Sequence, residues 1–223
     1  MKKLIELNIK EFLLVTAGDD PVPGGGSVSA MCGALSAALG QMVAQLTIGK
    51  KEYAEEEESM KEMAAVFNTY LDEFAKDIDT DAEAYDAVLE AFKLPKGTTK
   101  EKTLRTQKIQ EAMKVAVEIP LQVAKKAFRI MDFIHIVAKT GNPNAAADAC
   151  VAMMCARTAV LSALLNVKTN LPILHDEKFV ARVKDEVEGL ESGAKEKEER
   201  LLDWFYFKNS TVSIPSGVST LRI

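Results

Sequence analysis

The segment SVSAMCGALSAALGQMVAQLTI, residues 27–48, decides the fold class. It holds no charged side chain, and its strongly apolar residues alternate with Ala, Gly, Ser, Cys, Thr and Gln. Its length would cross a bilayer, but polar groups in this number are costly in hydrocarbon and tolerable in a packed protein interior. We therefore interpret the segment as a buried central helix, with a membrane span as the less favoured alternative.

A second segment of the same kind covers residues 143–167, where only Asp148 and Arg157 are charged. Helices that are apolar on every side belong in the middle of a bundle. The other segments with helical periodicity are 3–16, 52–92, 100–139 and 176–208. No segment alternates with the two-residue period of a strand.

The sequence thus predicts one all-α domain over residues 1–223. We expect a bundle of about six helices with long central helices, followed by an irregular tail from about residue 209. Because so little of the two central segments suits solvent, we expect a second subunit to cover part of them in a homodimer.

The composition limits the classes of function. The 223 residues include 28 Lys and Arg and 33 Asp and Glu, and the net charge of −5 argues against a nucleic-acid-binding protein. Three cysteines without a CxxC pair, and an N-terminus interrupted by charges, favour a cytoplasmic protein without a signal peptide. The only histidines, His135 and His175, are too few for a di-iron bundle, so we expect no metal site, and no residue pattern marks a dinucleotide cofactor site.

The residues between the helices suggest how each helix begins. Ser27 is expected to cap the helix that follows it, and Thr98 or Thr99 the helix of residues 100–139. The glycines before Ser27 are either a flexible turn or a source of backbone N–H groups for an anion. Pro120, in the middle of residues 100–139, is expected to kink that helix.

One carboxylate interrupts the apolar stripe of residues 52–92. The stripe consists of Met60, Met63, Phe67, Leu71, Phe74, Ile78, Tyr85, Val88 and Phe92. Asp81 falls on it, whereas Asp79 points roughly 200° away and Asp77 belongs to a solvated face. A buried carboxylate is costly unless it is paired or hydrogen-bonded, and burial raises its pKa. Asp81 is therefore either a proton-transferring group or a structural Asp bonded to a neighbouring helix end.

Four motifs in order resemble the formiminotetrahydrofolate cyclodeaminase and methenyltetrahydrofolate cyclohydrolase family. They are Pro23-Gly-Gly-Gly-Ser-Val-Ser-Ala30, Asp79-Thr-Asp-Ala-Glu-Ala-Tyr85 followed by Leu94-Pro-Lys96, Ile119-Pro-Leu121, and Gly141-Asn-Pro-Asn144 with Ala147-Asp-Ala149. The similarity covers nearly the whole chain. It implies an all-α, dimeric folate enzyme whose catalytic Asp is either Asp79 or Asp81, and the stripe favours Asp81.

The resemblance also implies the substrates. The first reaction to expect is cyclisation of 5-formiminotetrahydrofolate to 5,10-methenyltetrahydrofolate with release of ammonia. The alternatives are hydrolysis of 5,10-methenyltetrahydrofolate to the 10-formyl compound, or a helical module that binds folate without catalysis. Neither reaction calls for a cofactor, and a formiminotransferase would have to be a separate partner protein.

Several residues are candidates for holding such a folate. They are the backbone of Gly24, Gly25, Gly26 and Ser27, the hydroxyl of Tyr85, the cations Lys93 and Lys96 for a glutamate tail, and Asn142, Asn144 and Asp148 for the pterin. The alternatives are solvated lysines at a helix C-terminus and ordinary helix capping around Asn142.

Overall fold

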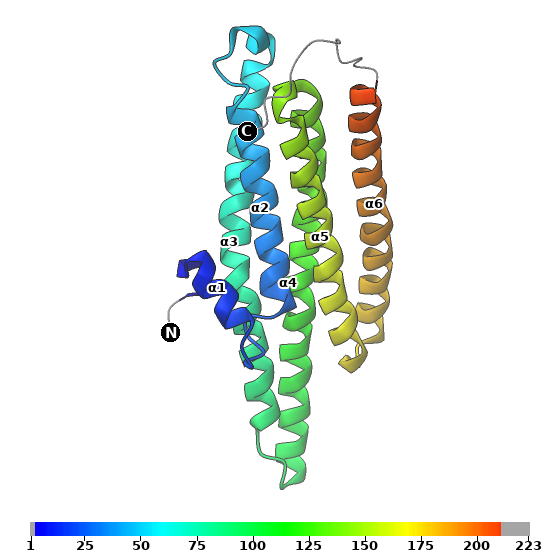
Figure 1. Ribbon diagram of the computed structural model, residues 1–223. Helices are drawn as coiled ribbons and strands as arrows, with labels where there is room; N and C mark the ends of the chain where they lie inside the picture. The colour runs from blue at the N-terminus through cyan, green and yellow to red at the C-terminus, as the bar shows by residue number, and fades with distance from the viewer. Residues whose placement is uncertain (1–2, 211–223) are drawn as a thin grey trace.

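The computed structural model describes residues 3–210, and for Asn209 and Ser210 the backbone alone. The helices are α1 (Ile9–Thr16), α2 (Gly25–Gln45), α3 (Glu57–Lys93), α4 (Thr99–Thr140), α5 (Ala146–Asn170) and α6 (Glu177–Ser210). Short 3-10 turns precede α1, α3 and α5 and follow α5. The helices form one elongated bundle (Figure 1). The predicted all-α bundle of six helices is confirmed, whereas the predicted tail lies almost wholly outside the described residues.

The two segments without a charged face, α2 and α5, occupy the middle of this bundle. α2 packs against α3 and α5, while α5 packs against α4 as well and, less extensively, against α6. Both are long and apolar enough to cross a membrane by length and composition alone. About half of each such stretch is buried within the bundle, which agrees with the predicted central position.

Glycines in α2 allow α3 to approach closely. Gly33 lies against the ring of Phe74, and Gly40 lies against the ring of Phe67. A Cβ atom on Gly33 would come within 2.6 Å of the Phe74 ring, and both phenylalanines are fully buried. The contacts repeat every seven residues along both antiparallel helices. The next repeat along both helices places Gly26 of α2 against Asp81 of α3.

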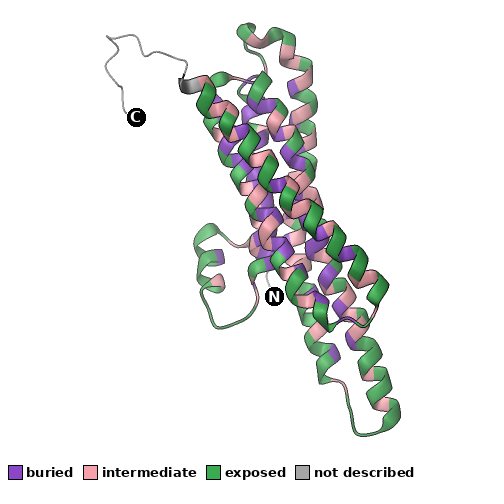
Figure 2. Ribbon diagram, turned by 90° about the vertical axis from the view of Figure 1, so that its right-hand side faces the viewer, coloured by how far each residue is buried: buried purple, intermediate pink, exposed green. Residues whose placement is uncertain are grey.

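The N-terminal segment forms an arm instead of the single helix predicted for residues 3–16. A 3-10 turn at Leu4–Glu6 is followed by α1, which begins after a capping box made by Asn8 and Glu11. Leu4 donates its backbone N–H to Oδ1 of Asp79 at 2.6 Å, which ties the arm to α3. Beyond this tie α1 projects from the bundle and is largely exposed (Figure 2).

Helices α3 and α4 form a hairpin that extends past the ends of the other helices (Figure 1). Thr98 begins α4 with a capping box: its hydroxyl accepts the N–H of Glu101, whose carboxylate accepts that of Thr98. Of the two caps predicted for this helix, Thr98 and Thr99, the structure uses Thr98. α4 continues as one helix through Pro120, which is buried.

Candidate functional site

A cavity of about 330 Å³ lies at the N-terminal end of α2, where α2, α3, α4 and α5 meet. Apolar side chains of α3 and α4 line much of it. The polar side chains at its wall are Asp81 and Tyr85 from α3, and Asn166, Thr169 and Asn170 from α5. Its volume is at the lower end of the range for small-molecule sites.

The carboxylate of Asp81 lies against the α-carbon of Gly26, one further repeat along the α2–α3 contact. A Cβ atom on Gly26 would overlap both carboxylate oxygens. Ile78, one turn earlier on α3, is buried, so Asp81 does follow the apolar stripe as predicted. Glycine is required at residue 26 because the carboxylate occupies the space of its side chain.

Burial raises the pKa of Asp81 above its ordinary value. Hydrogen bonds from the backbone N–H and the side chain of Ser27 act in the opposite direction, but the effect of burial is larger. A carboxyl whose two protonation states lie closer in free energy near neutral pH is suited to taking up and returning a proton.

Ser27 has a different role from the predicted one. α2 begins at Gly25 with Gly24 as its N-cap, so Ser27 lies within the first turn instead of capping it. Its hydroxyl donates to the carbonyl oxygen of Ile78 at 2.8 Å and joins α2 to α3. The glycines are therefore a helix start, and the backbone N–H of Ser27 serves the protein's own carboxylate, Asp81.

Asn166 and Asn170, one turn apart at the end of α5, are site residues that the sequence analysis missed. The amide of Asn166 lies beside Gly25, where a Cβ atom would be 3.5 Å from its Nδ2. The amide of Asn170 reaches α4 and donates to the carbonyl oxygen of Ala116 at 3.0 Å. The signal available in the sequence was a pair of amides spaced by four residues, about one helical turn, at the end of this helix.

The other acidic residues of α3 have structural partners. Asp79 accepts the N–H of Leu4, so it lies on a different face from Asp81, as the helical phase predicts. Asp77 was predicted to lie on a solvated face, but it forms a part-buried ion pair with Lys126. That prediction was wrong because α4 packs along this side of α3.

Of the remaining candidates in α3 and the turn after it, one lines the cavity and two do not. Tyr85 lines it and is 38% exposed. Lys93 pairs with Glu90 at 2.7 Å on the surface, and Lys96 lies in the exposed turn of the α3–α4 hairpin. Both lysines follow Phe92, the cavity residue nearest to them in the sequence.

Asn142, Asn144 and Asp148 lie at the opposite end of α2. The backbone N–H of Asn142 donates to Oγ1 of Thr47 at 2.8 Å, and its Nδ2 donates to the carbonyl oxygen of Leu46. Since 21 residues of α2 span about 30 Å, these groups are far from Asp81. The prediction that they share a pterin site with Asp81 does not hold within one chain, and Asn142 instead caps the turn before α5.

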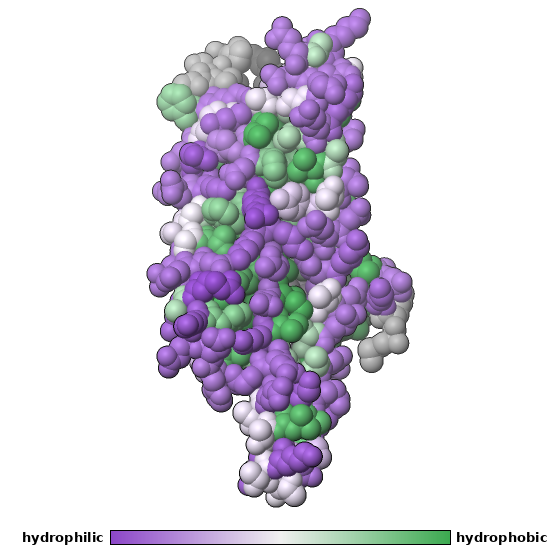
Figure 3. Space-filling view, turned by 180° about the vertical axis from the view of Figure 1, so that it is seen from behind, coloured by the Kyte–Doolittle hydropathy of each residue, from purple (hydrophilic) through white to green (hydrophobic). Residues whose placement is uncertain are grey.

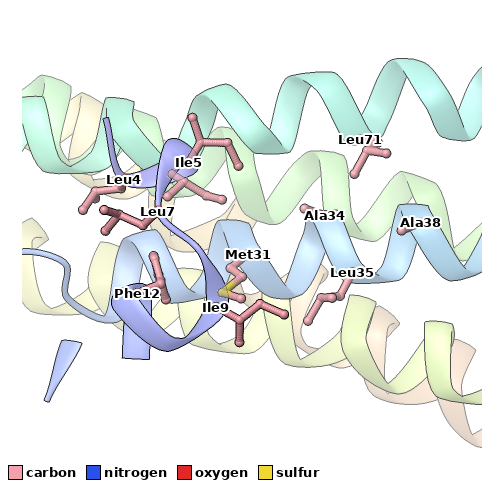
Figure 4. Close-up of a pocket in the computed structure, with 11 residues that line it drawn as sticks. Leu4, Ile5, Leu7, Ile9, Phe12, Met31, Ala34, Leu35, Ala38 and Leu71 are labelled. Carbon is pink, nitrogen blue, oxygen red and sulfur yellow. The ribbon is translucent and has the colours of Figure 1, made fainter. Parts of the chain in front are cut away.

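A second cavity, of about 200 Å³, lies between the N-terminal arm and α2 (Figure 4). Leu4, Leu7 and Phe12 of the arm line it together with Met31 and Leu35 of α2. Its lining side chains are apolar, so it offers no group for acid–base chemistry.

Comparisons with known proteins agree on one family. Residues 8–189 match the sequence profile described as formiminotransferase-cyclodeaminase. The chain is 42% identical over 188 residues to a methenyltetrahydrofolate cyclohydrolase of Methylorubrum extorquens, covering 83% of this chain and 90% of that protein. It is 31% identical over 194 residues to the formimidoyltransferase-cyclodeaminase of Rattus norvegicus, covering 87% of this chain and 36% of that protein.

The fold is also that of a solved structure. The crystal structure of formiminotetrahydrofolate cyclodeaminase from Thermotoga maritima matches with a TM-score of 0.81 and 27% sequence identity. The match covers 92% of this chain and 98% of that one.

Proposed function

The chain belongs to the formiminotransferase-cyclodeaminase family, and from this premise we propose that it opens or closes the five-membered ring of 5,10-methenyltetrahydrofolate. The observation that carries the proposal is Asp81, a carboxyl of raised pKa at the wall of a cavity. Both reactions of this ring need one group that accepts a proton and then returns it.

Of the two reactions, hydrolysis of the methenyl compound is the better supported. The cyclohydrolase relative is 42% identical to this chain, against 31% for the Rattus norvegicus formimidoyltransferase-cyclodeaminase. The cyclodeaminase reaction, which the sequence analysis put first, is the second candidate. It is favoured by the likeness to the Thermotoga maritima cyclodeaminase over nearly all of that chain.

In the cyclohydrolase reaction, water adds to the carbon that joins N5 and N10 of the folate. The Asp81 carboxylate takes one proton from this water as the carbon–oxygen bond forms. The bond from carbon to N5 then breaks, and the carboxyl returns the proton to N5. The second proton of the water passes to solvent as the formyl C=O forms, and 10-formyltetrahydrofolate leaves.

In the cyclodeaminase reaction, N10 attacks the carbon of the protonated formimino group on N5. Asp81 takes the proton from N10 as the ring closes and gives it to the departing nitrogen, which leaves as ammonia. Neither reaction changes an oxidation state, so acid–base chemistry and binding of the folate in its ring-forming conformation are sufficient.

The experiment that tests the proposal offers both substrates separately to the purified protein and follows methenyl absorbance. Loss of absorbance from 5,10-methenyltetrahydrofolate faster than its spontaneous hydrolysis supports the cyclohydrolase. Formation of absorbance from 5-formiminotetrahydrofolate, with ammonia release, supports the cyclodeaminase. Folate binding without either change in absorbance would indicate a module that binds folate without catalysis.

The α3–α4 hairpin is a suitable place for the glutamate tail of a folate. Lys93, Lys96, Lys100, Lys102 and Arg105 all lie in its outer part, within a chain of net charge −5. Carboxylates of a tail that leaves the cavity past Phe92 would meet these cations. A polyglutamated substrate should therefore bind more tightly than a monoglutamate.

A second copy of the chain is the proposed partner for the surface of α1, α2 and α5. Each of these helices carries exposed large apolar side chains: Ile9, Leu13 and Leu14 on α1, Leu35 on α2 with Leu46 at its end, and Met154 and Leu165 on α5. The face seen from behind in Figure 3 is mostly hydrophilic, with separate apolar patches. An apolar surface of this kind is typical of a homodimer interface.

We also place the protein in the cytoplasm, acting on a free folate without nucleic acid or membrane. Its three cysteines are free thiols, which is consistent with a reducing compartment. If the chain acts as a cyclodeaminase, a formiminotransferase activity has to supply its substrate, and the Rattus norvegicus relative is named for both activities.

A further inference from the structure

Pro120 leaves one carbonyl of α4 without its helical partner. In a regular helix the N–H of residue 120 would donate to the carbonyl oxygen of Ala116, but proline has no N–H. The proline ring also pushes that carbonyl away from the helix axis. Ala116 lines the cavity beside Asp81, so the unpaired carbonyl lies next to the site.

Asn170 of α5 supplies the missing donor. Its Nδ2 donates to the carbonyl oxygen of Ala116 at 3.0 Å. This hydrogen bond fixes which side of the amide is nitrogen, and so it fixes the direction of the carbonyl oxygen, Oδ1. The proline of α4 thereby sets the orientation of a side chain on α5.

Asn166, one turn earlier on α5, is held in the same way. Its Nδ2 donates to the carbonyl oxygen of Ser162 at 2.9 Å. Both asparagines line the cavity, and neither Oδ1 receives a hydrogen bond from the part of the chain that the structure describes. On the α5 side of the cavity, two asparagine amides thus have their nitrogens engaged and their oxygens left as acceptors for a ligand.

We propose that Pro120 and Ala116 position Asn170 so that its Oδ1, with that of Asn166, accepts hydrogen bonds from the N–H edge of the pterin ring. The inference rests on the proposed function, and it adds the residues that select the pterin and the direction in which it binds. A tetrahydropterin presents N–H donors at its 2-amino group and at ring nitrogens, which match two amide acceptors. The pterin then lies against α5, and the tail leaves along α3 past Phe92.

A purely structural role for Asn170, satisfying the Ala116 carbonyl and nothing else, makes a different prediction. It would affect stability but not the choice between two ligands that differ in one N–H donor group. Ligand discrimination is therefore the readout that separates the two roles.

The test compares binding of tetrahydrofolate with binding of its analogue in which methyl replaces the 2-amino group. We expect the wild-type protein to prefer tetrahydrofolate by about tenfold or more, because the analogue leaves an acceptor unpaired. In Asn170→Leu this ratio should fall toward one. In Pro120→Ala the helix itself can pair Ala116, so the ratio should also fall, without loss of helix by circular dichroism.

Asn68→Leu is the matched control, since Asn68 lies on the exposed surface of α3 beside Gln41. It should keep the wild-type ratio. Folded Asn170→Leu and Pro120→Ala proteins that discriminate as well as the wild type would overturn the inference, as would a wild type that does not discriminate. If Asn170→Leu does not fold, Asn166→Leu and Pro120→Ala decide by the same ratio. A wild type that binds neither ligand would overturn the proposed function and this inference with it.

Discussion

The carboxylate of Asp81 rests on the α-carbon of Gly26, so the chemistry of the cavity depends on the packing of α2 against α3. At two earlier repeats of the same contact, a glycine of α2 receives a phenylalanine ring from α3. At the third repeat, Gly26 of α2 receives the Asp81 carboxylate of α3, beside the cavity. Placing that group on a rigid helix–helix contact holds it in position for proton transfer.

Gly26→Ala should therefore lower turnover. The new methyl group overlaps the Asp81 carboxylate, which must move, and a displaced proton-transferring group costs about ten- to a hundredfold in kcat. Steady-state kinetics on folded protein measures the loss.

Gly189→Ala is the matched control for that substitution. Gly189 lies in α6, and a Cβ atom there meets nothing within 4 Å. Its turnover should be unchanged and its stability should rise by about 0.5–1 kcal/mol, because alanine favours a helix over glycine. A Gly26→Ala enzyme as active as Gly189→Ala would show that the position of Asp81 does not matter.

Asp81→Asn should raise the free energy of unfolding at neutral pH. Because the pKa of Asp81 is raised in the folded state, the folded protein holds its proton more tightly than the unfolded chain does. The wild type therefore loses stability as pH rises from the ordinary Asp pKa through the raised one. Asn cannot ionise, so this loss is absent from the variant.

Urea unfolding of both proteins across this pH window measures the difference. The advantage of Asp81→Asn should grow with pH and then level off above the raised pKa. An advantage that is independent of pH would mean that the pKa of Asp81 is the same in the folded and unfolded states.

The positions of the helices, and which side chains of α3 face the bundle, were predictable because they depend on local patterns. The apolar stripe put Asp81 on the packed side and Asp79 elsewhere, and the structure agrees. The N-cap of α2 was predicted three residues too late, at Ser27 instead of Gly24, because Ser is a common cap and only the packing shows that the Ser27 hydroxyl bonds to Ile78 of α3.

The composition of the cavity was less predictable, because it depends on which helix ends meet. Asn142 and Asp148 follow a recognisable motif, but α5 runs from that end of the bundle toward the other. Its last turn, with Asn166 and Asn170, therefore reaches the cavity. The partner of Asn170 is set by Pro120 across the α4–α5 contact, which no local pattern reveals.

Light scattering at micromolar concentration should give twice the 24.4 kDa mass of one chain. Leu165→Glu should shift the particle toward the monomer, since Leu165 is 63% exposed on α5 and a buried charge in the interface is costly. Ile136→Glu, on the exposed surface of α4, should leave the mass unchanged. A wild-type particle with the mass of a single chain would contradict the proposed dimer.

Replacing Lys93 and Lys96 by Gln should weaken binding of a polyglutamated folate more than that of the monoglutamate. The expected cause is the loss of attraction to tail carboxylates, so the difference should shrink at high salt. Lys50 and Lys51, exposed near the far end of α2, are the control pair. Equal losses of affinity for both folates would show that the hairpin does not bind the glutamate tail.

The most direct test of the account compares turnover of folded Asp81→Asn and Asp79→Asn proteins on the substrate that the wild type converts. Asn keeps the size of Asp81 but cannot carry its proton, so kcat should fall by about 10²-fold or more with little change in substrate affinity. Asp79 only ties down the N-terminal arm, so its variant should remain active. A folded Asp81→Asn enzyme with near wild-type kcat, or an inactive Asp79→Asn enzyme that keeps its fold, would contradict the assignment of Asp81 as the proton-transferring group.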